Sequence, residues 1–167
     1  MSLTDSLLPE FDREMASTRS LLERVPEDDA RWRPHPKSST LGDLAVHITR
    51  LPLWGRYVFA QTELDLGLPE NASIARAEFS TTAELLERFD RHVAEGHAAL
   101  AKASDGDMGA VWSLKNAGAV VLAMPRSMVF RSFVMSHLIH HRGQLSVYLR
   151  LRDVPLPSLY GPTADTR

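Results

Sequence analysis

Residues 136–144 (SHLIHHRGQ) contain a pair of histidines, His137 and His141, that are four positions apart in the sequence. Four residues is just over one turn of an α-helix, so in a helix His137 and His141 lie above one another on one face. Neutral imidazole is the commonest metal ligand in proteins. If the segment is helical, the pair predicts one side of a metal site.

A third histidine, His47, precedes this pair by about 90 residues and falls on the apolar face of another predicted helix. The sequence contains no cysteine, which excludes thiolate ligands, a disulfide framework and a cysteine nucleophile. Three histidines leave a coordination position for water or a thiolate. We therefore predict an open metal centre formed by His47, His137 and His141, and its catalytic acid or base stays unknown.

Helical periodicity indicates that these histidines face inward. On a wheel of about 100° per residue, His137 and His141 fall inside the apolar stripe of the last helix. Arg142 falls on the opposite side, which predicts that it is exposed to solvent, and His140 lies at the edge of the stripe. Burying imidazoles without partners is costly, and a divalent cation would offset that cost.

Each ligand needs a partner for its second ring nitrogen, and Asp43 and Gln144 are the candidates. Asp43 fits equally well as the acidic residue of a capping box that begins at Thr40, and Gln144 could instead bind backbone. A single buried histidine is more often a hydrogen-bonded core residue than a ligand, and two histidines at this spacing are a weak motif alone. The remaining histidines are predicted at the surface or at helix edges: His35, His92 and His97.

Four segments have the apolar spacing of helices, and together they predict an all-α fold. Pro9 is tolerated only in a first turn, so the first helix is expected to begin late or to kink there. We predict one domain over residues 1–167: a four-helix bundle with a long crossover carrying a short β-hairpin before the last helix. The helical segments extend to residue 25, then over 40–58 with a kink at Pro52, over 81–104 and over 125–152; residues 65–80 read as a loop and 108–124 as the hairpin.

Composition limits the class of partner. The 167 residues carry a formal net charge of -2 with a sequence pI near 6.4, which gives no electrostatic footprint for nucleic acid. The apolar runs are too short to span a membrane, and the N-terminal residues lack the features of a signal peptide. We therefore expect a cytoplasmic protein that acts on a small molecule.

Together these motifs resemble the DinB/YfiT-like family. The resemblance rests on residues 32–34 (WRP), 41–48 (LGDLAVHI) and 137–145 (HLIHHRGQL), with 148–150 (YLR) followed by Pro155. It implies a four-helix bundle in which His47, His137 and His141 bind a divalent metal, usually zinc or nickel, and it implies a homodimer. Characterised members are transferases or isomerases that use low-molecular-weight thiols such as bacillithiol or mycothiol, and others are described as metal-dependent hydrolases.

The favoured function is a metal-dependent enzyme that activates an external low-molecular-weight thiol or water for transfer to, or hydrolysis of, a small substrate. The alternative is a non-catalytic interaction or scaffold protein with a structural metal. Structural zinc sites usually have four protein ligands, and no obvious fourth is present, which favours an open site. A third interpretation is a metal-free bundle in which the histidines hydrogen-bond one another and water.

Overall fold

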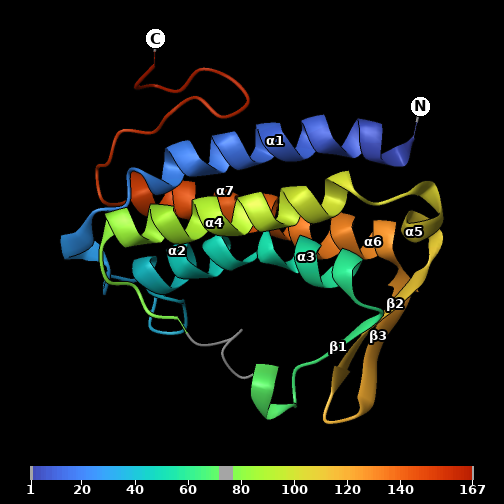
Figure 1. The fold of residues 1–167 in the computed structure, drawn as a ribbon. Coiled ribbons are helices and arrows are strands. Elements are labelled where there is room, and N and C mark those ends of the chain that lie inside the picture. Colours follow the sequence, from blue (N-terminus) through green and yellow to red (C-terminus); the bar gives the residue numbers. More distant parts are fainter. Residues whose placement is uncertain (1, 72–76, 167) are drawn as a thin grey trace.

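Long amphipathic helices account for most of the chain in the computed structural model, which describes residues 2–71 and 77–166 (Figure 1). A small three-stranded sheet and a short helix lie at one end of them. Part of the predicted loop, residues 72–76, lies outside the described residues. The helices are α1 (Leu3–Leu22), α2 (Leu41–Arg50), α3 (Leu53–Ala60), α4 (Thr82–Ala101), α5 (Asp105–Gly109), α6 (Arg126–Val129), η3 (Phe130–Ser136) and α7 (His137–Arg150); the strands are β1 (Glu63–Asp65), β2 (Val111–Asn116) and β3 (Ala119–Pro125).

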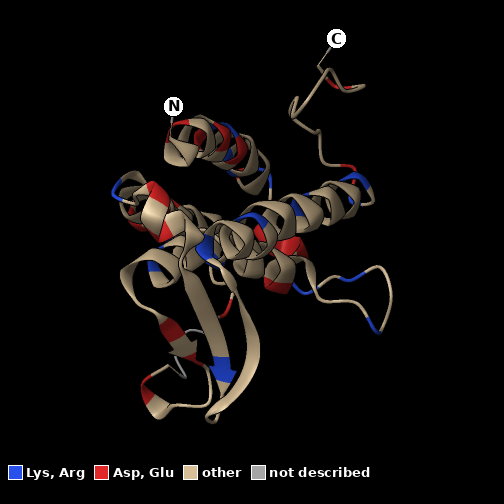
Figure 2. Cartoon of the chain, turned by 90° about the vertical axis from the view of Figure 1, so that its right-hand side faces the viewer, with Lys and Arg blue, Asp and Glu red and all other residues tan. Residues whose placement is uncertain are grey.

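The long helices lie side by side (Figure 1). Helix α2 contacts both α4 and α7, and α4 also contacts α1. Their facing sides form one apolar core, in which Leu7, Phe11, Ile48 and Leu138 are fully buried. The contact between α2 and α7 matters most for function, because it brings His47 next to the pair on α7. Acidic and basic residues are interspersed along the helices (Figure 2).

Helix α1 begins at Leu3 and contains Pro9, so of the two predicted alternatives, a late start or a kink at Pro9, the late start was wrong. Ser2 and Asp5 form a capping box that fixes the start of the helix ahead of the proline. Proline inside a helix costs about 3 kcal/mol. Burial of Leu7 and Phe11, at roughly 1.5–3 kcal/mol each, is enough to offset that cost.

The second predicted helix is divided at Pro52 into α2 and α3, where a kink was predicted. Proline removes the backbone donor that a continuous helix would need at this point. At the other end of α2, the Thr40 side chain accepts a hydrogen bond from the Asp43 amide, at 3.1 Å. This cap orients the first turn of the helix that carries His47.

The predicted hairpin is present as the antiparallel strands β2 and β3. Its turn contains Ala117 and Gly118, both with positive φ. Strand β1, which pairs in parallel with β2, was not predicted, because three residues carry too little periodicity to indicate a strand. Asp65 at its end accepts hydrogen bonds from the amides of Ala117 and Gly118, so it caps the hairpin turn from a distant part of the chain. The one-turn helix α5 was also missed.

Arg142 is buried, so the prediction that it is exposed to solvent was wrong. Its Nη2 donates to Glu14 Oε2 of α1 at 2.6 Å, and its Nη1 donates to the Glu14 carbonyl and to Thr18 Oγ1. The Tyr160 hydroxyl, from the C-terminal segment, also bonds to this pair. A guanidinium that is paired and hydrogen-bonded in this way can be buried.

None of the helices in the described part of the chain combines the length and the hydropathy needed to cross a membrane.

Candidate metal centre

Three imidazole rings from two helices meet at one point. His47 comes from the last turn of α2, while His137 and His141 come from the first two turns of α7. The Nε2 atom of His137 lies 3.2 Å from that of His47 and 2.9 Å from that of His141. All three side chains are half-buried, so the site is at the edge of the core rather than inside it.

This geometry fits a divalent metal ion. With zinc–nitrogen bonds of about 2.0–2.1 Å, a tetrahedral centre separates its nitrogens by about 3.3 Å. The two measured separations lie close to that value, and all three ligand atoms lie within 4.8 Å of one another. Among the described residues the group contains three histidines and no carboxylate, which corresponds to a site with an open position.

The second ring nitrogens of the α7 histidines have the acceptors that ligation requires. His141 Nδ1 donates to Gln144 Oε1 at 2.7 Å, and the ring of His137 is hydrogen-bonded to the Phe133 backbone carbonyl. A proton held there leaves the Nε2 lone pair directed at the common centre. Gln144 thus bonds to the second ring nitrogen of His141, which is the role that the sequence suggested for it. Asp43 is exposed and its amide donates to the Thr40 side chain, which is one half of the predicted capping box; the bond from the Thr40 amide to the Asp43 carboxylate is not formed among the described residues.

His47 differs from the other two, because its Nδ1 lies 3.2 Å from Nη2 of Arg50. A guanidinium only donates hydrogen bonds, so this contact uses the lone pair of Nδ1. Ligation through Nε2 leaves a proton on Nδ1. We therefore expect the contact between Arg50 and His47 to break when a metal binds.

Burial favours the neutral form of His47 and of His137. It lowers the pKa of His47 to about 4, with further lowering by the charges of His141, His137 and Arg50. Burial also lowers the pKa of His137, assisted by His141 and His140 and opposed by the Phe133 carbonyl. Neutral imidazole is the form that binds a metal, so these shifts favour a ligand-competent site near neutral pH.

A small cavity of about 260 Å³ lies beside the histidines. It gives a small molecule access to His47 and His141 from the side of the loop that precedes α2. Tyr148 closes one edge, packing edge-on against Trp32 with ring centroids 5.8 Å apart. The lining residues are Ser38, Ser39, Leu44, His47, His141, Gln144 and Tyr148.

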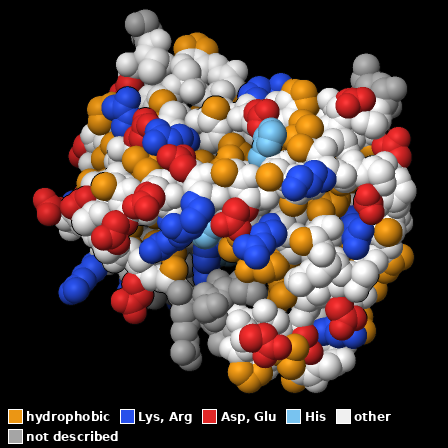
Figure 3. Space-filling view, viewed as in Figure 1, with side chains coloured by type: hydrophobic (Ala, Val, Ile, Leu, Met, Phe, Trp, Pro, Cys, Tyr) orange, Lys and Arg blue, Asp and Glu red, His pale blue; other side chains and the backbone are white. Residues whose placement is uncertain are grey.

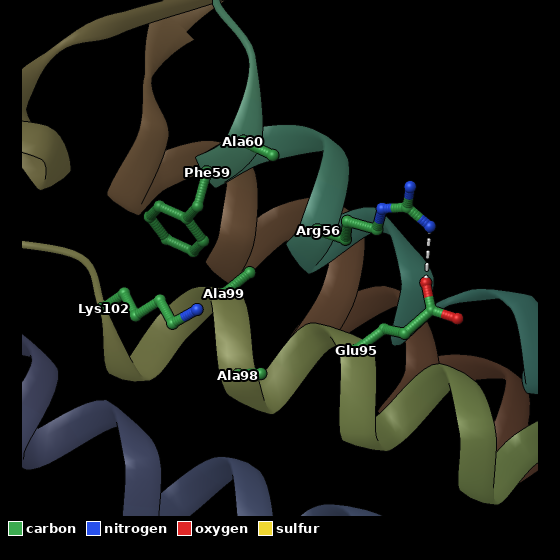
Figure 4. A pocket seen from close by; sticks show the side chains of 7 residues that line it. All are labelled: Arg56, Phe59, Ala60, Glu95, Ala98, Ala99 and Lys102. Carbon is green, nitrogen blue, oxygen red and sulfur yellow. Dashed lines mark hydrogen bonds and ion pairs between the residues drawn. The ribbon is translucent and has the colours of Figure 1, made fainter.

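A larger and more apolar cavity of about 440 Å³ lies between α3 and α4 (Figure 4). Phe59 and the two alanines Ala98 and Ala99 supply its apolar surface, and Arg56 and Glu95 form an ion pair of 2.7 Å at one side. It shares no lining residue with the histidine cavity. With Arg56 paired to Glu95 and no histidine in its lining, it is a poorer candidate for metal chemistry.

The other histidines stay outside the centre. His92 Nδ1 bonds to the Thr49 carbonyl at 2.8 Å, so it is half-buried rather than at the surface, while His35 is exposed as predicted. His97 lies 3.5 Å from Asp12, and His140 is exposed with its Nε2 3.1 Å from Gln144. Sequence reasoning did not single out Arg50, although its position three residues after His47 places it on the neighbouring face of α2.

Comparison with known proteins identifies a matching family and a shared fold. A protein-family model described as the DinB superfamily matches residues 10–145. No curated protein matches the chain. A crystal structure of a DinB-like protein from Bacillus cereus ATCC 10987 has a TM-score of 0.70 at 20% identity, over 93% of this chain and 97% of that chain.

Two further crystal structures have the same fold. A DinB-like protein from Bacillus subtilis has a TM-score of 0.70 at 18% identity, over 97% of this chain and 99% of that chain. A DinB-family protein from Exiguobacterium sibiricum 255-15 has a TM-score of 0.68 at 20% identity, over 100% and 99% of the two chains. At these identities the likeness concerns the fold.

Proposed function

The chain belongs to the DinB superfamily, and from this premise we propose that it is an enzyme that binds one divalent metal ion through His47, His137 and His141. The observation that carries the proposal is the convergence of three Nε2 atoms from α2 and α7. Zinc or nickel is the ion we expect. The proposal includes a single four-helix-bundle domain, a homodimer and a cytoplasmic location.

The ion would lower the pKa of a bound water or external thiol and so supply the nucleophile. Residues of the chain orient the histidine rings and contact the substrate. Gln144 holds the ring of His141 by its Nδ1 proton, and the Phe133 carbonyl does the same for His137. The cavity beside the histidines offers Ser38, Ser39 and Tyr148 to a small substrate. We propose transfer of a low-molecular-weight thiol, or hydrolysis, as the reaction class.

Metal analysis of the purified protein tests the ligands. We expect about one divalent ion per chain in the wild type and near-complete loss in His47→Ala and His137→Ala, because an open site cannot hold its ion with two protein ligands. His97→Ala is the matched control, since His97 lies beside Asp12 outside the centre, and it should keep the ion. Full metal content in both ligand variants would refute the assignment.

A catalytic ion is distinguished from a structural one by activity. The metal-loaded protein is assayed for conjugation of a panel of small thiols to epoxides and halogenated electrophiles, and for hydrolysis of esters and amides. We expect turnover that disappears in His137→Ala and persists in His97→Ala. A protein that retains its ion but is inactive throughout, with a fourth protein ligand on the ion, would favour the scaffold interpretation.

A further inference from the structure

Three arginines line one small cavity next to the histidine centre. Arg50 comes from α2, and Arg88 and Arg91 come from α4, which lies against it. The cavity has a volume of about 190 Å³. Figure 3 shows a hollow on this face below α4, with Lys and Arg side chains around it and a histidine in it. The remaining lining residues are Leu53, Tyr57, Ala77 and His92.

Arg88 and Arg91 differ from neighbouring arginines, which form ion pairs with carboxylates. Arg56, which lines the apolar cavity of Figure 4, is paired with Glu95, and Arg19 is paired with Asp90. Within residues 2–71 and 77–166, neither Arg88 nor Arg91 forms an ion pair with a carboxylate. Arg88 donates one long hydrogen bond of 3.5 Å to the Glu78 carbonyl.

The positive charges also act on one another. Burial lowers the pKa of His92, with further lowering by Arg91 and Arg88 and an opposing effect of the Thr49 carbonyl. Arg50 and Arg88 are half-buried and Arg91 is exposed, and gathering their like charges around one cavity is unfavourable unless an anion joins them. The cavity therefore has the electrostatics of an anion site.

The arginine cavity shares no lining residue with the histidine cavity, and the link between the two sites is Arg50, whose Nη2 lies 3.2 Å from Nδ1 of His47. An anion that binds Arg50 is thus one imidazole ring away from the ligand atom of His47. Sites for whole small molecules usually have volumes of about 300–1,000 Å³, so a cavity of about 190 Å³ suits one charged group of a larger molecule.

We propose that this arginine cavity, lined by Arg50, Arg88 and Arg91, binds the anionic oxygen group, a carboxylate or phosphate, of a substrate or thiol cosubstrate whose reactive part reaches the metal centre. The proposal rests on the proposed function for the role of the metal, but the anion site itself depends only on the arginines. Guanidinium groups match carboxylates and phosphates with two parallel hydrogen bonds, which gives both charge and orientation.

Calorimetric titration with inorganic phosphate and with succinate, at constant ionic strength in chloride, tests the site. We expect at least one probe to bind saturably to metal-free wild-type protein. Replacing both α4 arginines, Arg88→Gln with Arg91→Gln, should weaken binding at least about tenfold, because each charge-assisted hydrogen bond contributes strongly. Arg56→Gln is the matched control, and its affinity should stay within about twofold of the wild type.

Binding of neither probe would overturn the proposal, as would an equal loss in Arg56→Gln. Binding that requires the divalent ion would also overturn it, because the anion would then sit on the metal. Should the double variant fail to fold, Arg88→Lys replaces it: lysine keeps the charge but lacks the planar pair of donors, so affinity should still fall. Since the metal-free protein is used, this result is independent of whether the histidines bind an ion.

A second experiment tests the connection between the arginine cavity and the metal centre. Cobalt-loaded protein is titrated with mercaptosuccinate and with 2-mercaptoethanol, and the visible absorption of cobalt is followed. The anionic thiol should saturate at a concentration at least about tenfold lower in the wild type, and the double arginine variant should lose this advantage. Equal affinity for the two thiols in the wild type would refute the connection and leave the anion site intact.

Discussion

At the scale of single residues, the hydrogen-bond partner of the ring nitrogen that faces away from the centre decides whether each histidine can present Nε2 to a metal ion. Gln144 Oε1 accepts a hydrogen bond from His141 Nδ1, and the Phe133 carbonyl accepts one from the ring of His137, which fixes the tautomer that presents Nε2 to the centre. Arg50 cannot do so for His47, because it has no acceptor. The centre thus has two oriented ligands and a third whose Nδ1 partner must move.

The low pKa of His47 predicts a pH-dependent stability of the metal-free protein. An unfolded histidine titrates near pH 6.5, whereas folded His47 titrates at about 4, so between these values the unfolded chain binds more protons. The contribution is complete above pH 6.5 and is lost as the pH falls toward 4. It amounts to at most about 3 kcal/mol.

Urea denaturation at a series of pH values measures this effect. We expect the free energy of unfolding to fall from pH 7 to pH 4, and to fall less steeply in His47→Gln, whose amide does not titrate. The same slope in wild type and variant would show that His47 does not titrate below its ordinary range.

Gln144 offers a second prediction at this scale. Removing the partner of a metal-binding histidine commonly weakens metal binding by about 10–100-fold, so Gln144→Ala should do so here. Gln144→Glu should restore affinity, since a carboxylate oxygen also accepts from His141 Nδ1. Competition with a chromogenic chelator measures both, with Ser146→Ala as a control on the same helix, since its hydroxyl bonds only to the Gly143 carbonyl. Unchanged affinity in Gln144→Ala would contradict the orienting role.

At the scale of elements, the orientation of α7 decides which side chains reach the centre. Its buried residues Leu138, Arg142 and Leu145 point about 110° away from His137 on a helical wheel. The histidines therefore lie at the border of the core, where solvent and substrate have access. Leu151, which follows the last residue of α7, is 55% exposed.

The wheel failed at this helix because the preceding seven residues, η3, form a π-helix. With hydrogen bonds from i to i+5, each residue turns through less than 100°. Phe130 and Val134 then line up with Leu138 rather than with His137, and all three are fully buried. The sequence carries no local signal for this change of pitch, so its effect on Arg142 could not be foreseen.

The buried pair of Arg142 and Glu14 ties α7 to α1 and yields a third prediction. Arg142→Leu leaves the Glu14 carboxylate buried without its partner and should lower the free energy of unfolding by about 3–5 kcal/mol. Adding Glu14→Leu should recover much of this loss, because the isolated charge is then gone. A double-mutant cycle by urea denaturation checks the coupling; additive losses would contradict it.

At the scale of the whole molecule, the features that could be predicted from the sequence are those with a strong local pattern. The spacing of His137 and His141, the cap at Thr40 and the break at Pro52 each have a local physical cause. The pairing of β1 with β2 and the approach of Arg50 to Arg88 depend on contacts between distant segments. Such contacts follow from packing of the complete chain, which no local pattern records.

The centre joins helices whose ligands are about 90 residues apart in sequence, so an ion bound there should stabilise the folded chain as a whole. Binding at a free concentration 100 times the dissociation constant adds about 2.7 kcal/mol. For a chain of this length we therefore expect the Tm to rise by about 5–11 °C on addition of zinc or nickel. His47→Ala should abolish the rise, and His97→Ala should preserve it. Because His47 is the sole ligand that α2 contributes among the described residues, a rise retained without it would mean that the ion is held by α7 alone.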